Sequence, residues 1–472
     1  MTVTHVAGAI HADAIRASPQ WLRYPSDANE LTDGLWAKHV ARDENGEIRV
    51  AGVSVTELAE RVGTPAYVYD EADFRERALQ FRDSFAPGEV YYAGKAFLSA
   101  KVVDWVVESG LGIDVCTEGE LRLALAAGAP VAALALHGNN KSDTELELAI
   151  QAGVGRIVVD SMDEIARIER IAAAADKPAR VLVRVTTGVE AHTHEYIATA
   201  HEDQKFGFSI VGGQALMALV RCQQSPHAEL LGVHSHIGSQ IFDTQGFEVA
   251  ARRTLKLMKQ FEQATGIELP QLDLGGGFGI AYTGADHPRP IEELVEGLKE
   301  IVEAECRAQR LSVPELSIEP GRAIAGPAAF TLYRVGTVKP VELDSGAQRL
   351  YVSVDGGMSD NIRPALYAAE YSAVIANRAS SAEPVLARVV GKHCEGGDIV
   401  VRDVFLPGDI QVDDLIAVPG TGAYCRTMAS NYNHVLKPPV VSVAAGELTT
   451  LLQRETYDDL FALDPALNER QG

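Results

Sequence analysis

The chain has 472 residues, which is too long for one ordinary domain and indicates two. It carries 42 Lys and Arg residues against 65 Asp and Glu residues, a formal net charge of −23. An acidic protein of this kind repels nucleic-acid phosphates and anionic membranes, so we expect neither as a partner. The five cysteines are scattered and odd in number, which disfavours a disulfide framework or a structural zinc site and favours a reducing cytoplasm. We find no signal-peptide pattern at the N-terminus, and no stretch approaches the roughly 20 apolar residues that span a bilayer.

The first part of the chain is weakly patterned. Residues 1–46 are predicted to form an N-terminal extension, loosely ordered over about the first 35 residues. Residues 47–64 then indicate a strand and a short helix, 64–70 another strand, and 71–86 a helix. We expect residues 47–87 to associate with a C-terminal β domain.

From residue 88 apolar strand candidates alternate with helical stretches. Near-continuous apolar strands separated by helices are typical of a parallel sheet, and eight such units in about 250 residues are the size of a closed β/α barrel. We therefore predict a parallel (β/α)8 TIM-like barrel over residues 88–328. The expected strands are 89–96, 111–117, 132–138, 156–160, 180–185, 231–238, 272–277 and 316–321, with seven helical regions between them, including 118–128, 142–153, 161–175, 246–264 and 291–310.

After Pro327 the pattern changes to short strands with turn signals. This predicts a second, C-terminal domain over residues 329–472, an antiparallel β-barrel or sandwich, interrupted by a helix near 361–370.

Polar and glycine-rich residues gather at the carboxyl ends of the predicted barrel strands, where barrel enzymes place their active sites. They are Lys95, Asp114, His137, Arg184, His236, Gly275–Gly277 and Glu319–Arg322. Lys95 stands in the apolar, aromatic segment VYYAGKAFL. Most lysines are solvated surface residues, but a buried amine has a lowered pKa and can form a Schiff base with an aldehyde.

Two further motifs suggest a cofactor with a phosphate and a ring nitrogen. The glycine-rich turn GGGFG (275–279) follows a strand, and its backbone N–H groups could bind phosphate, although many such turns are only tight turns. It lacks the GxGxxG and P-loop spacings, which disfavours a nucleotide site. In EPGR (319–322), Glu319 could hold a pyridine nitrogen protonated and Arg322 could bind an anion; the ordinary alternative is a structural ion pair.

Two other groups have open interpretations. His234 and His236 in HSHIGSQ could be packed core histidines, zinc ligands of a barrel hydrolase, or a ring that stacks on a cofactor. A zinc site would need further ligands such as His137 and Asp114, and would leave the lysine and the glycine loop unexplained. In the second domain, Cys394 lies in the polar loop HCEGGD and could donate a proton, although a free cysteine is usually a small buried hydrophobe.

Taken in order along the chain, these motifs resemble the fold type III, alanine-racemase-like decarboxylases that depend on pyridoxal 5′-phosphate (PLP), and most closely the diaminopimelate decarboxylases. The similarity runs from about residue 47 to the C-terminus. It covers YAGKAF, HGNNKS (137–142), HEDQKFGFS (201–209), HSHIGSQ, LGGGFG, EPGR, DGGMSDNIRPALY (355–367), HCEGGD and GAYC (422–425). The loop reads CEGGD where the family usually has CESGD.

The resemblance implies a role for each matching residue. Lys95 would bind PLP covalently, His236 would stack on its ring, and Glu319 would pair with the pyridine nitrogen. The other cofactor contacts would come from Ser239, Gly276, Gly277, Pro320, Gly321, Arg322 and Tyr424.

The resemblance also implies the reaction, the decarboxylation of meso-2,6-diaminopimelate to L-lysine and CO2, the last step of lysine biosynthesis. Cys394 would protonate the carbanion. The substrate would be held by Arg322, Arg363, Tyr367, Glu395 and Tyr424. Because the Cys-Glu loop of this family enters the partner's site, a homodimer is expected, and no metal is required. The alternatives are a decarboxylase of another diamino acid or of a carboxylated polyamine and, more remotely, a metal-dependent barrel hydrolase.

Overall fold

The computed structural model describes residues 18–188, 205–343, 346 and 348–467. The chain divides into two compact units, which we call the β unit and the barrel unit. The β unit comprises Met1–Phe74, Ala281–His287 and Ala325–Gly472, and the barrel unit comprises Arg75–Ile280 and Pro288–Ile324. Among the described residues, no helix is long and apolar enough to cross a membrane.

Eight parallel strands close the barrel, as the sequence predicts. Each strand pairs in parallel with the next, and the last pairs with the first through Ser317–Glu89 and Ile318–Val90. A two-residue strand, β10 (Phe208–Ser209), adds to the side of β9. The barrel strands are β5 (Glu89–Ala93), β6 (Gly112–Val115), β7 (Leu134–Leu136), β8 (Arg156–Val159), β9 (Ala179–Thr186), β11 (Ala228–Ser235), β12 (Gln271–Asp273) and β13 (Glu315–Ile318).

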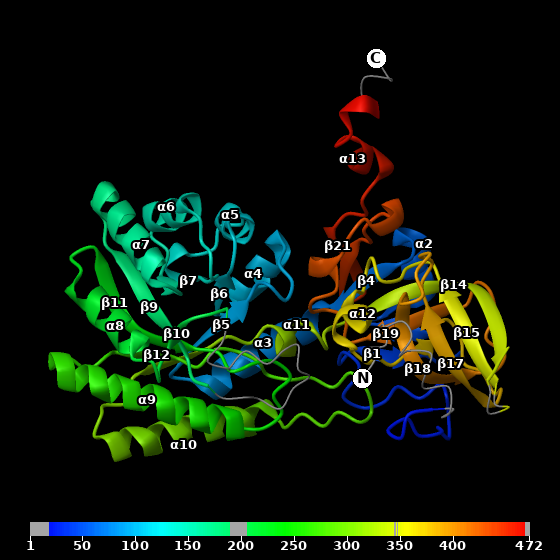
Figure 1. Ribbon diagram of the computed structural model, residues 1–472. Helices are drawn as coiled ribbons and strands as arrows, with labels where there is room; N and C mark the ends of the chain where they lie inside the picture. Colours follow the sequence, from blue (N-terminus) through cyan, green and yellow to red (C-terminus); the bar gives the residue numbers. More distant parts are fainter. Residues whose placement is uncertain (1–17, 189–204, 344–345, 347, 468–472) are drawn as a thin grey trace, which may run out of the picture. The chain divides into compact units, whose positions relative to one another are not determined.

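Helices follow the strands, and several begin on a hydroxyl cap. The side chains of Ser99, Thr117, Ser142 and Ser161 each accept the backbone N–H three residues later. Such caps satisfy N–H groups that the first turn cannot pair, and so fix the short loops at the carboxyl rim. Figure 1 shows α5 to α7 along one side of the strands and α9 and α10 along the other. The helices are α3 (Glu71–Phe85), α4 (Ala100–Glu108), α5 (Glu118–Ala126), α6 (Asp143–Ala152), α7 (Met162–Ala175), α8 (Gln214–Gln224), α9 (Gln245–Thr265), α10 (Ile291–Gln309) and α11 (Arg322–Ala325).

The β unit is organised around one long strand, β14 (Ala329–Glu342). Its first half pairs with β4 (Ala66–Asp70) and β19 (Leu415–Pro419), and its second half with β15 (Gln348–Val354). The other strands of the unit's main sheet are β16 (Val374–Ile375), β17 (Pro384–Val390), β18 (Ile399–Pro407), β20 (Val440–Ala444) and β21 (Glu447–Leu452). Two pairings, β15–β17 and β4–β20, are parallel rather than antiparallel as expected. Parallel neighbours need a long connection. Residues 355–383, including α12 (Arg363–Tyr367), provide it for the first pair, and residues 71–439, which include the whole barrel, provide it for the second.

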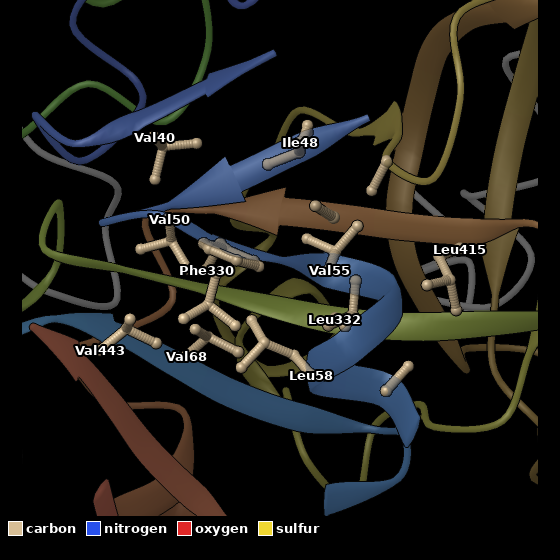
Figure 2. Close-up of a cluster of buried hydrophobic side chains, with 14 of the residues drawn as sticks. Val40, Ile48, Val50, Val55, Leu58, Val68, Phe330, Leu332, Leu415 and Val443 are labelled. Atoms are coloured by element: carbon tan, nitrogen blue, oxygen red, sulfur yellow. The ribbon is translucent and has the colours of Figure 1, made fainter. Parts of the chain in front are cut away.

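The N-terminal segment is part of this unit's core. Strands β1 (Val40–Arg42), β2 (Ile48–Val50) and β3 (Val53–Ser54) form a small sheet that leads into α2 (Val55–Val62). Their apolar side chains pack with those of β4, β14 and β19, and Figure 2 shows Ile48, Val50 and Leu58 beside Phe330 and Leu332.

The expected N-terminal extension is therefore an integral element from about Leu35, which is only 2% exposed. The backbone N–H of Ile48 also donates to the carbonyl of Ala376 at 2.7 Å. The reason is that the small sheet buries one apolar face, a long-range contact that weak local patterning did not indicate. Residues 1–17 lie outside the described part of the chain.

Candidate active site

Lys95 stands at the carboxyl rim of the barrel, two residues beyond the end of β5. Its side chain is exposed, so the buried amine that its apolar flanks suggested is not what the structure shows. The apolar flanks Tyr92 and Phe97 are buried, but the lysine itself follows the last strand residue and leaves the packed interior. Its charge still acts on its surroundings: burial first, and then Lys95, hold the pKa of His236 well below its usual value.

A buried cluster lies at the same end of the barrel, around Glu319. Oε2 of this carboxylate accepts a hydrogen bond from Nε2 of His234 at 3.3 Å. Its Oε1 lies 2.9 Å from Nε2 of His137, yet this contact is not aligned as a hydrogen bond, and Oε1 is left without one. The Nε2 atom of His137 also lies 3.5 Å from Oδ1 of Asp114. All four side chains are at most 5% exposed.

The surroundings keep Glu319 ionised. Burial alone would raise the pKa of Glu319, but His137 and His234 outweigh it and hold that pKa well below its usual value. The pKa of His137 is shifted in the opposite direction to that of Glu319. Burial alone would lower the pKa of His137, but Asp114 and Glu319 outweigh burial and raise it. Burial lowers the pKa of His234, so this imidazole is neutral and donates through Nε2.

The glycine turn after β12 packs against backbone on both sides. A Cβ added to Gly276 would come within 2.3 Å of the carbonyl oxygen of Glu319, and one added to Gly277 within 2.5 Å of that of Gly238. Gly277 also has φ +104°, which side-chain-bearing residues rarely adopt. The turn is thus held against the loops that follow β11 and β13. The amide of Gly276 donates to Nδ1 of His236 at 3.2 Å, which fixes that ring.

Ser239 and Arg322 provide polar groups beside this turn. The guanidinium of Arg322 donates from Nη2 to Oγ of Ser239 at 2.8 Å, and the Arg322 side chain is 8% exposed. Pro320 accepts the backbone N–H of Ala93 through its carbonyl, and a Cβ on Gly321 would come within 2.9 Å of Ala93. The EPGR segment is therefore fastened to β5, the strand that leads to Lys95.

These groups fit PLP. Glu319 offers a buried oxygen without a hydrogen bond, the type of acceptor that a protonated pyridine nitrogen requires. Lys95 supplies an amine for the aldehyde, while Arg322, Ser239 and the backbone of the glycine turn have the donor chemistry that binds phosphate. The barrel unit alone carries all of these groups.

The remaining predicted residues belong to the β unit. Arg363 and Tyr367 stand four residues apart on α12, and the Arg363 side chain is 4% exposed. Its guanidinium lies over the ring of Tyr282 at 4.7 Å and donates to the hydroxyl of Tyr371. Among the described residues no carboxylate pairs with Arg363. A buried cation without an acidic partner is unusual and is a candidate for binding an anionic ligand.

Cys394 and Glu395 are exposed on a loop whose two ends are anchored. His393 and Asp398, at the two ends of the loop, are joined because the backbone N–H of His393 donates to Oδ2 of Asp398 at 2.7 Å. The other oxygen of Asp398, Oδ1, accepts the backbone N–H of Met358 at 2.6 Å. The ring of His393 is held by Oγ of Ser359 at 2.8 Å. The loop therefore presents both side chains outward from a fixed base.

Tyr424, the last residue predicted to contact the cofactor, has a positive φ of 61° and is half-buried. Backbone strain of this kind is often found at ligand sites, because the surrounding structure must hold it in place.

The pairing of Glu319 with two histidines was missed by sequence reasoning. The motifs indicate His137 only as a rim residue or metal ligand, and His234 only together with His236. In the structure His234 and His236 have separate partners. The Nε2 atom of His234 contacts Glu319, whereas Nδ1 of His236 accepts the backbone N–H of Gly276. The ligand atoms of His137, His234 and Glu319 do lie within 4.8 Å of one another, a spacing that a metal ion could also use.

Comparisons with known proteins agree with this chemistry. Residues 71–326 match the family of the pyridoxal-dependent decarboxylases, through its pyridoxal binding domain. A diaminopimelate decarboxylase of Mycobacterium tuberculosis (strain ATCC 25618 / H37Rv) is 52% identical over 439 residues, 92% of this chain and 98% of the relative. That of Mycobacterium leprae (strain TN) is 50% identical over 467 residues, 98% and 99% of the two chains.

A solved structure supports the same assignment. The diaminopimelate decarboxylase from M. jannaschii, in complex with L-lysine, superimposes with a TM-score of 0.83 and 28% identity, covering 91% of this chain and 98% of the other. The predicted barrel, the second β domain and the PLP cofactor are thereby confirmed. The chain belongs to the pyridoxal-dependent decarboxylases and, within them, to the diaminopimelate decarboxylase family.

Proposed function

We propose that this chain decarboxylates meso-2,6-diaminopimelate to L-lysine and CO2, the last step of lysine biosynthesis. The observation that carries the proposal is the similarity to diaminopimelate decarboxylases over more than nine-tenths of the chain, since it includes both the barrel unit and the β unit. Bound PLP supplies an electron sink for the bond that breaks.

The barrel unit holds and orients the cofactor. Lys95 would hold the cofactor through its amine, and Glu319, which keeps one oxygen without a hydrogen bond, would pair with the pyridine nitrogen. His236, whose Nδ1 is fixed by Gly276, presents its ring to the cofactor. The low pKa of His236 keeps that ring neutral, so it adds no charge against the protonated pyridine.

Ser239, Arg322 and the backbone of Gly276 and Gly277 bind the phosphate. The hydrogen bond from Arg322 to Ser239 prearranges the two side chains, which lowers the cost of ordering them when the anion arrives. Pro320 and Gly321 connect this phosphate site to Glu319, and Tyr424 completes it.

The β unit supplies substrate recognition. Arg363 is already desolvated among aromatic rings and has no acidic partner in the described residues, so a substrate carboxylate at this point forms a strong ion pair. Tyr367 and Tyr424 of this unit would share the binding of the distal end with Arg322 of the barrel unit, and Glu395 would pair with the distal ammonium. A substrate lacking the distal carboxylate leaves the buried arginine unpaired, which penalises ornithine and lysine.

Cys394 delivers the proton. When the bond between Cα and the carboxylate breaks, CO2 leaves and the thiol of Cys394 gives its proton to Cα. The exposed position of Cys394 in one chain is consistent with a loop that completes the site of a second copy, and we therefore propose a homodimer with shared active sites. We also propose that the enzyme works in the cytoplasm, since its five cysteines form no disulfide bond in the described part of the chain.

The test is CO2 release from PLP-loaded protein supplied separately with meso-diaminopimelate, L-ornithine, L-arginine and L-lysine. Release from meso-diaminopimelate alone, lost in Lys95→Ala, is the expected result. Equal release from ornithine would overturn the substrate assignment and leave the cofactor assignment intact.

Arg363→Leu tests the recognition of the distal carboxylate. We expect kcat/KM for meso-diaminopimelate to fall on the order of 30-fold or more, because removing one partner of a hydrogen-bonded charge pair costs about 2–5 kcal/mol. Arg334→Leu is the matched control, since Arg334 is a partly exposed arginine on the same unit. A loss of equal size in both variants would contradict the role of Arg363.

A further inference from the structure

The carboxylate of Glu319 is contacted from two sides by imidazoles whose function the decarboxylation mechanism does not use. His137 follows β7, His234 lies in β11, and Glu319 follows β13. In the barrel these strands are not neighbours, because β12 separates β11 from β13, and β5 and β6 separate β13 from β7. The contacts therefore cross the barrel interior, beneath the rim that carries Lys95.

The two contacts differ in a way that defines the carboxylate's orientation. His234 donates an aligned hydrogen bond to Oε2, while His137 lies close to Oε1 without alignment. Oε2 is thus occupied, and Oε1 is charge-compensated but keeps a lone pair for another donor. The rings of His137 and His234 also meet edge to face, with centroids 5.0 Å apart, so each restricts the other.

From this geometry we infer that His137 and His234 are positioning residues for the cofactor, which hold Glu319 in the orientation that presents Oε1 to the pyridine nitrogen. The inference rests on the proposed pairing of Glu319 with PLP. His137 lies closest to Oε1 and compensates its charge, whereas His234 donates the aligned hydrogen bond to Oε2. The two residues therefore act on different oxygens of the same carboxylate.

The other charged groups facing this cluster support the division of roles. Asp114 on β6 faces His137 and favours its protonated form, and Asp273 on β12 acts in the same direction on His234. Lys95 and Arg184 disfavour a positive charge on His236. Overall the pKa of His137 is raised, while burial lowers the pKa of both His234 and His236, so a positive charge is most favoured on the imidazole beside Oε1.

The experiment measures cofactor binding by the apoprotein, which is independent of any substrate. PLP is titrated into His137→Leu, His137→Gln, His234→Leu and His234→Gln, and Kd and the visible absorption band are recorded from pH 6 to 9. A glutamine amide can reach the position of Nε2 and keeps a donor, whereas leucine removes it. We expect His234→Leu to bind PLP on the order of 10- to 100-fold more weakly, the range for a hydrogen bond to a charged group. We expect His234→Gln to recover most of that loss. His137→Leu, which removes the charge contact at 2.9 Å, should also weaken PLP binding.

Glu319→Gln separates positioning from general structural damage. If the histidines act through Glu319, His234→Leu in the Glu319→Gln background weakens PLP binding by less than about threefold more, because a double-mutant cycle is non-additive for coupled residues. The control is His39→Leu, which removes another imidazole–carboxylate pair, His39–Asp70, in the β unit. We expect that variant to retain the parental Kd and absorption band.

Three results would overturn the inference. The first is parental affinity and spectrum in both leucine variants. The second is full additivity with Glu319→Gln, and the third is stoichiometric zinc in the purified protein that is lost with His137 or His234. None of these depends on which amino acid the enzyme decarboxylates, so a failure here is distinguishable from a failure of the proposed function.

Discussion

The substitution Lys141→Met tests how a buried ion pair supports the active-site rim. The side chain of Lys141 is 1% exposed and that of its partner Glu164 is 0% exposed. Nζ of Lys141 donates to Oε1 of Glu164 at 2.7 Å and to the carbonyls of Gly138 and Val158 at 2.7 and 2.6 Å. Since Gly138 follows His137 directly, this lysine fastens the loop that carries one of the two histidines at Glu319.

The expected cost follows from what the substitution leaves behind. Methionine fills a similar volume but leaves an unpaired carboxylate in the interior, for which the loss in unfolding free energy is about 3–5 kcal/mol. Without Lys141, Glu164 can remain buried only by taking up a proton. Its folded pKa is then above its unfolded pKa, so the variant is most stable at low pH. The penalty grows by about 1.4 kcal/mol for each pH unit until the folded pKa is reached.

Urea unfolding of the apoprotein, followed by circular dichroism at pH 5 and pH 8, measures both effects. The double variant Lys141→Met, Glu164→Gln should regain most of the stability, because a buried pair replaced as a whole costs far less than a broken one. Arg122→Met is the matched control: Arg122 pairs with Glu118 on the exposed face of α5, so we expect a change within about 1 kcal/mol. A penalty below about 1 kcal/mol for Lys141→Met, or the same penalty at both pH values, would refute the reasoning.

Three further predictions follow from other sites. Burial raises the pKa of Asp360 to about 7 from 3.8. The resulting contribution to the free energy of unfolding, about 4 kcal/mol, is therefore complete below about pH 4 and is lost as the pH rises through 7. Asp360→Asn should flatten the pH dependence of urea unfolding between these pH values, and an unchanged slope would contradict this prediction. Gly276→Ala places a Cβ within 2.3 Å of the carbonyl oxygen of Glu319, so it should weaken PLP binding at least 10-fold in a titration of the apoprotein. In the control Gly284→Ala the added Cβ would meet only Thr32 at 3.8 Å, so that variant should bind PLP with the parental affinity. Prolonged dialysis against a chelator should leave CO2 release unchanged after PLP is restored. A loss of CO2 release that only a metal ion reverses would instead support a metal site of the hydrolase type.

The amino-acid sequence by itself determined the barrel and the chemical groups at its rim. Parallel barrel strands are buried on both faces, so they read as continuous apolar runs, and the helices between them carry local caps such as Ser142 and Ser161. Lys95, the glycine turn and EPGR each follow a strand, and because parallel barrel strands all end at the same rim, this order alone places the three motifs together.

Only the tertiary structure decided which groups touch. His137, His234 and Glu319 come from strands that are separated in both sequence and barrel order, so no local pattern could pair them. The same holds for β4, which enters the β unit between β14 and β20, and for the segment 281–287, which groups with that unit although it follows barrel strand β12. Apolar periodicity and capping act over a few residues, whereas strand partners and buried ion pairs depend on how the whole chain closes.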